Sequence, residues 1–545
     1  MQLSEILLAG GLGEMTSFSS SAYLLFFFPA CLALYALIPK NGKKYFLLFA
    51  SAVFYWLVSG TLIIYLAISV LSIHYFGLWL DRLASKRSAA VKEAADREEK
   101  KAVKKKYTSK SRAVLALAVV LHIGVLLTLK YSPFFTFNVN TLLGLLKVSF
   151  RFEIPSYLQP IGISFFTLQA VSYITDVYRG VVKADENIGR LALYMSFFPQ
   201  IVEGPICRYG QTAEALWNVS QIKFENLTFG LQRVAFGLMK KVVIADRLNQ
   251  FVKNVFGNYE KWNGGLVAIV AVAYTVQLYM DFSGAMDGVV GTAEIFGVKM
   301  PENFERPFFS KTISEFWKRW HVTLGAWFKD YIFYPVTMSK SMKKLTSSAR
   351  KKLGNHLGPL LAGSIALFCV WLSNGLWHGA GWNYIFFGMY HFVLILLGSL
   401  VAPAVNKVNS TLHIKPEWFG YRVLQMLRTS VLVVIGELFF RADGLKEGFS
   451  MFKKMVTDFT FPTFDEKTIK ILNFGKGGIA VVFLGILIVF VVSVLNEKGI
   501  SVREELRKRN VVLRWIVLLA LVMFIFVAGA YGMAFAPVDP LYAEF

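Results

Sequence analysis

Residues 478–495 read GIAVVFLGILIVFVVSVL, eighteen consecutive positions without a charged side chain. An α-helix of this length and composition can cross the hydrocarbon core of a bilayer. Comparable apolar runs recur along the chain and predict further crossing helices at about 21–38, 45–58 with 61–80, 113–130, 266–280, 357–372, 383–402, 422–440 and 512–534. This recurrence predicts an all-α polytopic membrane protein.

Other segments combine apolar residues with helix-breaking or polar ones, namely 134–149, 157–174, 190–206 and 225–250. Such segments can be re-entrant or interfacial, because irregular backbone at membrane depth needs protein or a cavity to satisfy its polar groups. We therefore expect about ten to twelve crossing helices and a few partial ones.

The composition agrees with this fold class. Of 545 residues, 55% are apolar and 17% are charged, against about 25% charged residues in an ordinary soluble domain. The net charge of +23 would suggest nucleic-acid binding in a soluble protein, but cytoplasmic loops of membrane proteins gather Lys and Arg anyway. We expect no nucleic-acid partner. Cys31, Cys207 and Cys369 lack metal-ligand spacing, so we expect buried thiols and no metal site.

The basic segments set the predicted orientation. Residues 86–112 hold eleven Lys or Arg and four Asp or Glu, which places them in the cytoplasm as a solvated helix or loop. The basic loops 339–352 and 497–509 should lie on the same side. The last span then runs outward, and the tail 535–545 lies outside.

The stretch 311–334, KTISEFWKRWHVTLGAWFKDYIFY, is the first that indicates chemistry. Thr312 followed by Glu315 predicts a capping-box start. Aromatic residues then recur at helical spacing, which predicts one helix with His321 in an aromatic wall. Lys318 and Arg319 are available to bind phosphate. An interfacial helix with aromatic and basic anchors explains the same pattern without a ligand.

The stretch 371–384, WLSNGLWHGAGWNY, places His378 among glycines and tryptophans, with Asn374 one turn before it. An ionisable residue at membrane depth is costly, which makes it a functional candidate by default. The structural alternative is a neutral histidine that is hydrogen-bonded between helices.

Two further stretches carry polar groups in apolar surroundings. In 197–210, FFPQIVEGPICRYG, the prolines break any helix, and Gln200 and Arg208 suggest a turn that lines a tunnel, although an ordinary loop is the alternative. Asp281 and Asp287 lie six residues apart and do not share a helix face, so we expect no paired acid/base or metal site there. Small residues around them suggest close helix packing.

Several long motifs occur in one order along the chain: Phe18-Ser19-Ser20, PIGISFFTLQAVSYITDVYRG (160–180), FFPQIVEGPICRYG (197–210), DFSGAMDGVVG (281–291), PENFERPF (301–308), EFWKRWHVTLGAWFKDYIFYP (315–335) and NGLWHGAGWNYIFFGMYH (374–391). In these motifs the chain resembles the membrane-bound O-acyltransferases, and within them the alginate O-acetylase branch with its peptidoglycan and teichoic-acid relatives. The resemblance implies a ring of helices around a central funnel. It also suggests three regions: 1–112 with N-terminal spans, 113–400 as catalytic core, and 401–545 with C-terminal spans.

The resemblance assigns the central catalytic histidine to His378 and the second position of its pair to His321. Acyl transfer from a thioester to a hydroxyl needs a base, and imidazole suits this task near neutral pH. His378 would be that base, with His321 and Asn374 positioning the donor or oxyanion. We expect acetyl-CoA as donor, no bound cofactor, and further substrate contacts from Lys318, Arg319, Trp377, Gln200 and Arg208.

The C-terminal residues 537–545 read PVDPLYAEF. Tyr542, three residues before Phe545, is similar to the C-terminal Tyr-x-x-Phe motif of envelope acylation systems. The resemblance implies that Tyr542 accepts the acyl group and passes it to an extracytoplasmic, SGNH-hydrolase-like acyltransferase partner. A frayed terminus is the alternative.

We therefore expect an acyltransferase in the bacterial plasma membrane, in contact with lipid, that moves acetyl groups outward for O-acetylation of a cell-envelope polysaccharide. The alternative within the enzyme class is D-alanyl transfer from a carrier protein to teichoic acid. The alternative outside it is a proton-coupled transporter or channel in which the histidines form a relay.

Overall fold

The computed structural model describes residues 20, 22–462 and 476–531 of the chain. In this part all regular elements are helices, and the β-type pairing is a single bridge between Phe304 and Trp320. The chain divides into two compact units. Their described residues are 20, 22–231 and 289–301 for unit 1, and 232–288, 302–462 and 476–531 for unit 2.

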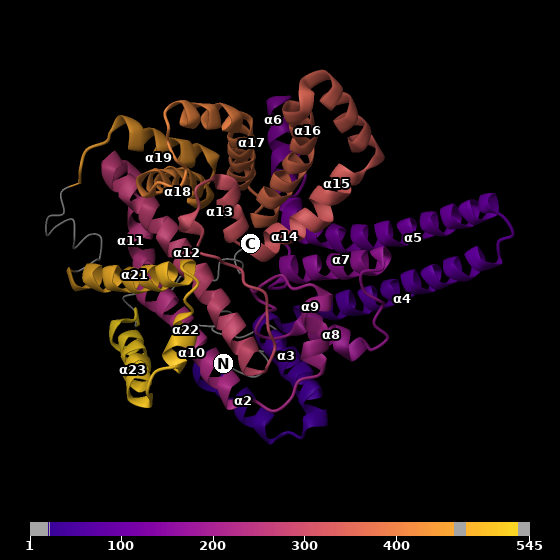
Figure 1. The fold of residues 1–545 in the computed structure, drawn as a ribbon, viewed down its shortest axis with the longest axis horizontal. Helices are drawn as coiled ribbons and strands as arrows, with labels where there is room; N and C mark the ends of the chain where they lie inside the picture. Colours follow the sequence, from indigo (N-terminus) through magenta and orange to yellow (C-terminus); the bar gives the residue numbers. More distant parts are fainter. Residues whose placement is uncertain (1–19, 21, 463–475, 532–545) are drawn as a thin grey trace. The chain divides into compact units, whose positions relative to one another are not determined.

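Unit 1 holds the N-terminal helices (Figure 1). They are η2 (Ala22–Phe27), α2 (Phe28–Leu37), η3 (Lys40–Gly42), α3 (Lys43–Ser59), η4 (Gly60–Leu62), α4 (Ile63–Glu93), α5 (Arg97–Leu126), η5 (Leu127–Tyr131), α6 (Ser132–Leu145), α7 (Ile163–Arg179), α8 (Ile188–Ser196) and α9 (Tyr209–Trp217). Two helices have residues in both units: α10 (Phe224–Leu238) and α12 (Gly264–Ile295).

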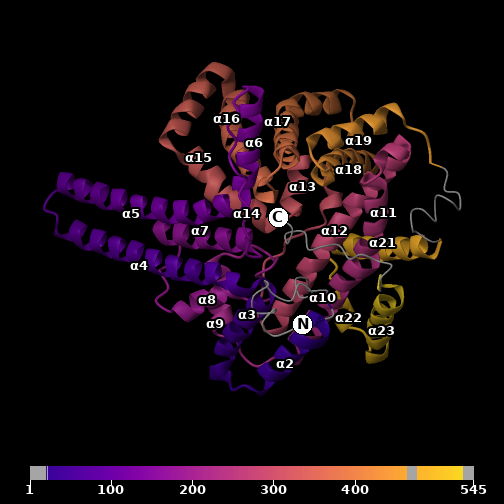
Figure 2. The same ribbon diagram turned by 180° about the vertical axis from the view of Figure 1, so that it is seen from behind.

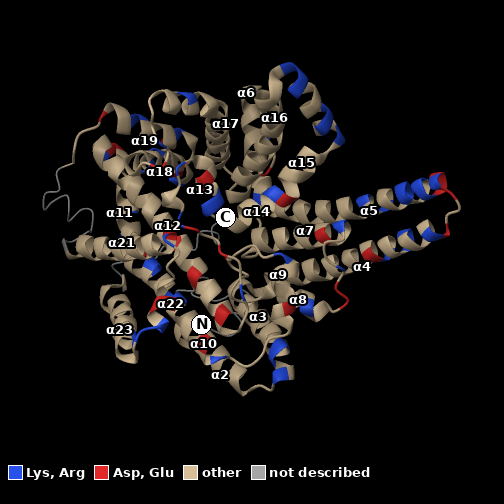
Figure 3. Cartoon of the chain, viewed as in Figure 1, with Lys and Arg blue, Asp and Glu red and all other residues tan. Residues whose placement is uncertain are grey.

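Helices α4, α5 and α7 of unit 1 pack side by side, as Figures 1 and 2 both show. The basic segment predicted as a solvated helix or loop is helical over most of its length, since α5 begins at Arg97. Asp96 caps this helix by accepting a hydrogen bond from the backbone N–H of Glu99 at 2.7 Å. Lys and Arg residues gather along the far ends of α4 and α5 (Figure 3).

The predicted break at 197–210 is confirmed. Between α8 and α9 the chain is not helical, yet most of it is buried. Its backbone is satisfied by side chains from unit 1: Tyr194 Oη donates to the Cys207 carbonyl at 2.9 Å, and Ser51 Oγ accepts from the Phe198 N–H at 3.1 Å. These bonds explain how irregular backbone persists in an apolar protein.

Unit 2 holds the remaining helices. They are η6 (Met239–Ala245), α11 (Asp246–Phe256), η7 (Tyr259–Lys261), η8 (Pro307–Phe309), α13 (Ile313–Arg319), α14 (Val322–Phe328), η9 (Lys329–Phe333), α15 (Tyr334–Met338), α16 (Lys340–His378), α17 (Trp382–Thr411), α18 (Phe419–Arg441), α19 (Leu445–Thr457), α21 (Lys476–Glu497), α22 (Val502–Arg507) and α23 (Val511–Ala528).

Helix α16 reverses direction at Gly354, whose φ of 79° a right-handed helix cannot hold. Most of the basic segment 339–352, expected as a loop, is therefore the first helical arm of α16. The second arm packs against α17 through glycine. A Cβ on Gly388 would lie 2.3 Å from the Trp371 carbonyl oxygen, and one on Gly375 would lie 2.5 Å from that of Tyr384. Larger side chains would separate the two helices.

Asp281 and Asp287 on α12 form two separate ion-pair groups, as the absence of a shared helix face predicts. Asp281 contacts Lys241 at 2.7 Å, whereas Asp287 contacts Lys240 at 2.7 Å and Arg233 at 3.0 Å. The expected close packing of small residues is also present, since a Cβ on Gly284 would lie 2.7 Å from the carbonyl oxygen of residue 237 on α10.

Eight helical stretches among the described residues are long and apolar enough to cross a membrane. They are Lys40–Glu93, Arg97–Leu145, Gly264–Ile295, Lys340–His378, Trp382–Thr411, Phe419–Arg441, Gly477–Glu497 and Val511–Ala528. The first contains both α3 and α4, and the second both α5 and α6. The all-α multi-pass membrane fold is confirmed, while the count of ten to twelve crossings and the central funnel stay predictions.

Candidate active site

His321 lies at a break between α13 and α14 of unit 2. Its φ of 47° falls in the left-handed region, which does not continue a right-handed helix. The prediction of one continuous helix over 311–334 is therefore wrong at this residue. The predicted helix start is confirmed, because the Thr312 side chain accepts a hydrogen bond from the backbone N–H of Glu315.

The break is stabilised by pairing with a segment that lies before the helix in the sequence. The Glu305 N–H donates to the Arg319 carbonyl at 2.8 Å, and the Val322 N–H donates to the Asn303 carbonyl at 3.0 Å. The bridge between Phe304 and Trp320 lies between these two bonds. The backbone groups that the helix would have used are thus satisfied elsewhere.

The side chain of Asn303 fixes the tautomer of His321. Asn303 Oδ1 lies 3.2 Å from the backbone nitrogen of Thr323, 2.8 Å from Thr323 Oγ1 and 3.2 Å from His321 Nδ1. A backbone N–H can only donate, so the Asn303 atom that faces it must be the oxygen and not the amide nitrogen. That oxygen accepts from His321 Nδ1–H, and the lone pair of the imidazole is therefore on Nε2.

Aromatic rings enclose His321. The Phe282 ring centroid lies 4.8 Å and the Trp377 centroid 5.7 Å from that of the imidazole, and only 3% of the residue is exposed. His321 is outside the eight candidate spans. Burial lowers its pKa well below the ordinary value, and the neighbouring charge of His378 lowers it further. The neutral imidazole is consequently the form present at neutral pH.

His378 is the last residue of α16, and the turn 379–381 follows before α17 begins at Trp382. Helix α16 therefore ends at the glycine-rich turn. The Trp377 ring, which borders His321, also lies 5.1 Å from the His378 ring between centroids, and Phe440 of α18 lies 5.2 Å away. The two imidazoles thus share one aromatic wall in unit 2.

Known proteins resemble this chain over most of its length. Residues 182–350 match the profile of MBOAT, the membrane-bound O-acyltransferase family. The probable alginate O-acetylase AlgI of Pseudomonas aeruginosa is 31% identical over 447 residues, which cover 82% of this chain and 75% of that protein. The chain belongs to the membrane-bound O-acyltransferase family.

The alignments with two other relatives cover less of this chain. The peptidoglycan O-acetyltransferase of Helicobacter pylori is 29% identical over 371 residues, or 63% of this chain and 65% of that protein. The teichoic acid D-alanyltransferase of Bacillus subtilis is 32% identical over 240 residues, which cover 43% of this chain and 58% of that protein. Membership in the family makes this protein an acyltransferase and not a channel.

The remaining predicted site residues of the O-acyltransferase lie in different surroundings. Asn374 is buried one turn before His378, and its Oδ1 accepts no hydrogen bond from the described residues. Lys318 is exposed, whereas Arg319 forms ion pairs with Glu315 at 2.9 Å and Glu497 at 3.1 Å. These carboxylates compete with phosphate for the Arg319 guanidinium.

Gln200 and Arg208 belong to unit 1. Gln200 is 4% exposed and Arg208 is half-buried. Tyr542 lies outside the described residues, so its predicted role stays a prediction.

Sequence reasoning missed Asn303 and Phe282 as neighbours of His321. Both lie in motifs that carry the family resemblance, PENFERPF and DFSGAMDGVVG. Their position in those motifs was the available signal. The spacing within 311–334 holds no information about Asn303, which lies outside this stretch and precedes His321 by eighteen positions.

Proposed function

We propose that this O-acyltransferase transfers an acetyl group from acetyl-CoA on the cytoplasmic side to a hydroxyl of a cell-envelope polysaccharide on the outer side of the bacterial plasma membrane. The observation that carries the proposal is the buried pair of imidazoles, His321 and His378, on one aromatic wall. Two relatives are named O-acetylases or O-acetyltransferases, which favours acetyl over D-alanyl as the group transferred.

The proposed chemistry assigns the general base to His378. As the hydroxyl oxygen forms its bond to the thioester carbonyl carbon, His378 takes the hydroxyl proton. When the carbon–sulfur bond breaks, the leaving thiolate receives that proton as the thiol of coenzyme A, so the histidine is restored. His321 supplies an Nε2 lone pair that accepts a hydrogen bond from donor or acceptor, while Asn374 and the backbone N–H groups near Gly379 stabilise the oxyanion.

Repulsion between the two imidazoles supports this division of roles. The charge of His378 lowers the pKa of His321, which means that the two rings oppose carrying protons at the same time. When His378 holds the hydroxyl proton, His321 is therefore kept neutral and in its fixed tautomer.

Completion of the reaction involves the tail and a partner. We infer that Tyr542 accepts the acetyl group first, as an O-acetyl-tyrosine, with His378 taking the phenol proton, and that an extracytoplasmic SGNH-hydrolase-like transferase then receives it. Phenol has a pKa near 10 and needs such a base. We propose further substrate contacts from Trp377 and Lys318 of unit 2. Contacts from Gln200 and Arg208 of unit 1 stay predictions from the sequence.

The test uses membranes that contain the full-length protein and isotope-labelled acetyl-CoA. We expect labelled acetate on the C-terminal peptide by mass spectrometry, and its loss in the H378Q variant. A Y542F variant should lose both tail label and polymer acetylation; polymer acetylation that persists in Y542F would refute the tyrosine relay alone. Transfer of D-alanine from a loaded carrier protein, with none from acetyl-CoA, would refute the acetyl donor.

A further inference from the structure

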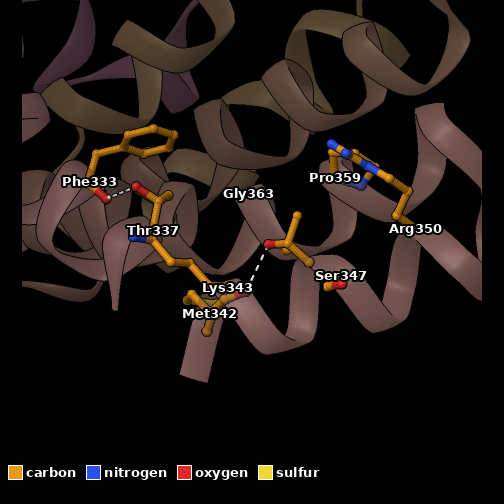
Figure 4. A pocket seen from close by; sticks show the side chains of 10 residues that line it. Phe333, Thr337, Met342, Lys343, Ser347, Arg350, Pro359 and Gly363 are labelled. Atoms are coloured by element: carbon orange, nitrogen blue, oxygen red, sulfur yellow. Dashed lines mark hydrogen bonds between the residues drawn. The ribbon is translucent and has the colours of Figure 1, made fainter. Parts of the chain in front are cut away.

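A cavity of about 520 Å³ lies in unit 2, away from the two histidines. Its walls come from the two arms of α16 and from the residues just before them, and Figure 4 shows the side chains that line it. Its size falls in the range of small-molecule sites, about 300–1,000 Å³, and exceeds what a single inorganic ion would fill.

Two glycines build this cavity. Gly354, with φ of 79°, turns the chain back so that the arms lie against each other. Gly358 then allows close contact, because a Cβ there would lie 2.5 Å from the backbone nitrogen and Cα of Arg350. The cavity is thus a consequence of the folded hairpin and not a gap between separate units.

Two exposed cations line the cavity, one toward each end of it (Figure 4). Lys343 and Arg350 lie seven residues apart on the first arm of α16, and Ser347 lies between them on the same helix face. Among the described residues, neither cation forms an ion pair with an acidic side chain. Residues 331–378 contain six Lys or Arg and no Asp or Glu, so the local potential favours an anion.

Apolar side chains also line the cavity, among them Phe333, Met342, Pro359 and Ala362. The threonine hydroxyls at the cavity are already used: Thr337 Oγ1 donates to the Phe333 carbonyl at 3.0 Å, and Thr346 Oγ1 donates to the Met342 carbonyl at 2.8 Å. Strong donors for a ligand therefore come from Lys343 and Arg350.

We propose that this cavity binds a phosphate ester, with a phosphate against Lys343 or Arg350 and the uncharged part of the molecule against the apolar side chains. Arg and Lys side chains bind phosphate through charge-assisted hydrogen bonds. Two sources have this chemistry, the headgroup of an anionic phospholipid and the phosphorylated nucleotide portion of a soluble donor. The lipid source is independent of the acetyl-transfer proposal, whereas the nucleotide source rests on the proposed function, since it is part of the donor named there.

The experiment measures binding to the purified full-length protein in neutral detergent by microscale thermophoresis. One arm uses 3′,5′-ADP and the other dihexanoyl-phosphatidylglycerol below its micellar concentration. The variant K343Q/R350Q removes the two cavity cations. The matched control, K344Q/K351Q, removes two exposed cations with the same spacing from the same arm, and these do not line the cavity.

We expect K343Q/R350Q to weaken binding of one probe about tenfold or more, and K344Q/K351Q to weaken it less than about threefold, as loss of distant exposed charge does. Stronger binding of the lipid identifies a headgroup site, and stronger binding of the nucleotide identifies a donor site. Equal weakening in both double variants would overturn the proposal, because diffuse charge would then explain binding. Binding of neither probe would also overturn it.

Discussion

Replacement of Asn303 by leucine, which has a similar volume and no acceptor, tests the control of the His321 tautomer. The side-chain oxygen accepts from three donors, on His321 and Thr323, and the residue is 1% exposed. The Thr323 hydroxyl can rotate, but its backbone N–H cannot, so at least one buried donor is orphaned. This costs about 1–3 kcal/mol.

The loss of activity in N303L should exceed what this destabilisation explains. Without the acceptor, His321 can turn or move its proton to Nε2, which removes the lone pair from the reacting side. We expect acyl transfer to fall roughly 10²-fold or more, measured as thiol release from acetyl-CoA at a temperature where the variant is folded. The matched control is N249L, because Asn249 is also buried in unit 2 and its Oδ1 also accepts a hydrogen bond, from Gln277 at 3.1 Å.

The pH profile of the N303D variant distinguishes an effect of Asn303 on the protonation of His321 from a purely structural role of Asn303. A carboxylate keeps the acceptor but raises the pKa of His321 by its negative charge. His321 and the general base His378 must both be neutral, so the acid limb of the pH profile reports whichever imidazole takes up a proton at the higher pH. Burial and the charge of His378 keep the pKa of His321 below the ordinary histidine range in the native protein. N303D should raise that pKa by at least about one pH unit, bring His321 into the limb and move the limb upward. Full activity in N303L, or an unshifted limb in an active N303D, would refute the reasoning.

Other substitutions test the rest of unit 2. H321Q and H378Q should each lower transfer roughly 10²-fold or more, and the double variant should fall little further, because groups that act as a unit are not additive; multiplied effects would argue for separate roles. G388V should prevent folding, since its Cβ would meet the Trp371 carbonyl, whereas G398V on the same helix, with no atom within 4 Å of its Cβ, should express normally. K241M leaves the buried carboxylates of Asp281 and Asp246, which lie 2.7 and 3.0 Å from Lys241 Nζ, without that cation. It should cost about 3–5 kcal/mol, seen as a lower melting temperature in detergent that the exposed-site control K253M does not show.

The helices of this protein are predictable because their signal is local. The expected span 422–440 lies within α18, and 383–402 lies within α17. Boundaries are less predictable where solvated sequence continues the helix. The span expected at 113–130 belongs to a helix that begins at Arg97, because Lys, Glu and Ala favour helix and Asp96 caps it.

The site was predictable as a set of residues but not as a geometry. Composition and motif single out His321 and His378, and Trp377 does contact both rings. The left-handed backbone of His321 could not be predicted, because it depends on pairing with residues 303–305 across a gap in the sequence. Helical periodicity assumes that each backbone group bonds within its own helix, and that assumption fails here.

The buried ion pairs of α12 fix the position of the Phe282 ring against His321. Side chains six residues apart on an α-helix point about 120° apart, and consecutive side chains of η6, a π-helix, also point in different directions. The neighbouring residues Lys240 and Lys241 of η6 can therefore reach Asp287 and Asp281 separately, at 2.7 Å each. A slip of one residue between the two elements would leave buried charges unmatched, which is strongly destabilising. Because Phe282 follows Asp281 directly, the same ion pairs hold its ring against His321.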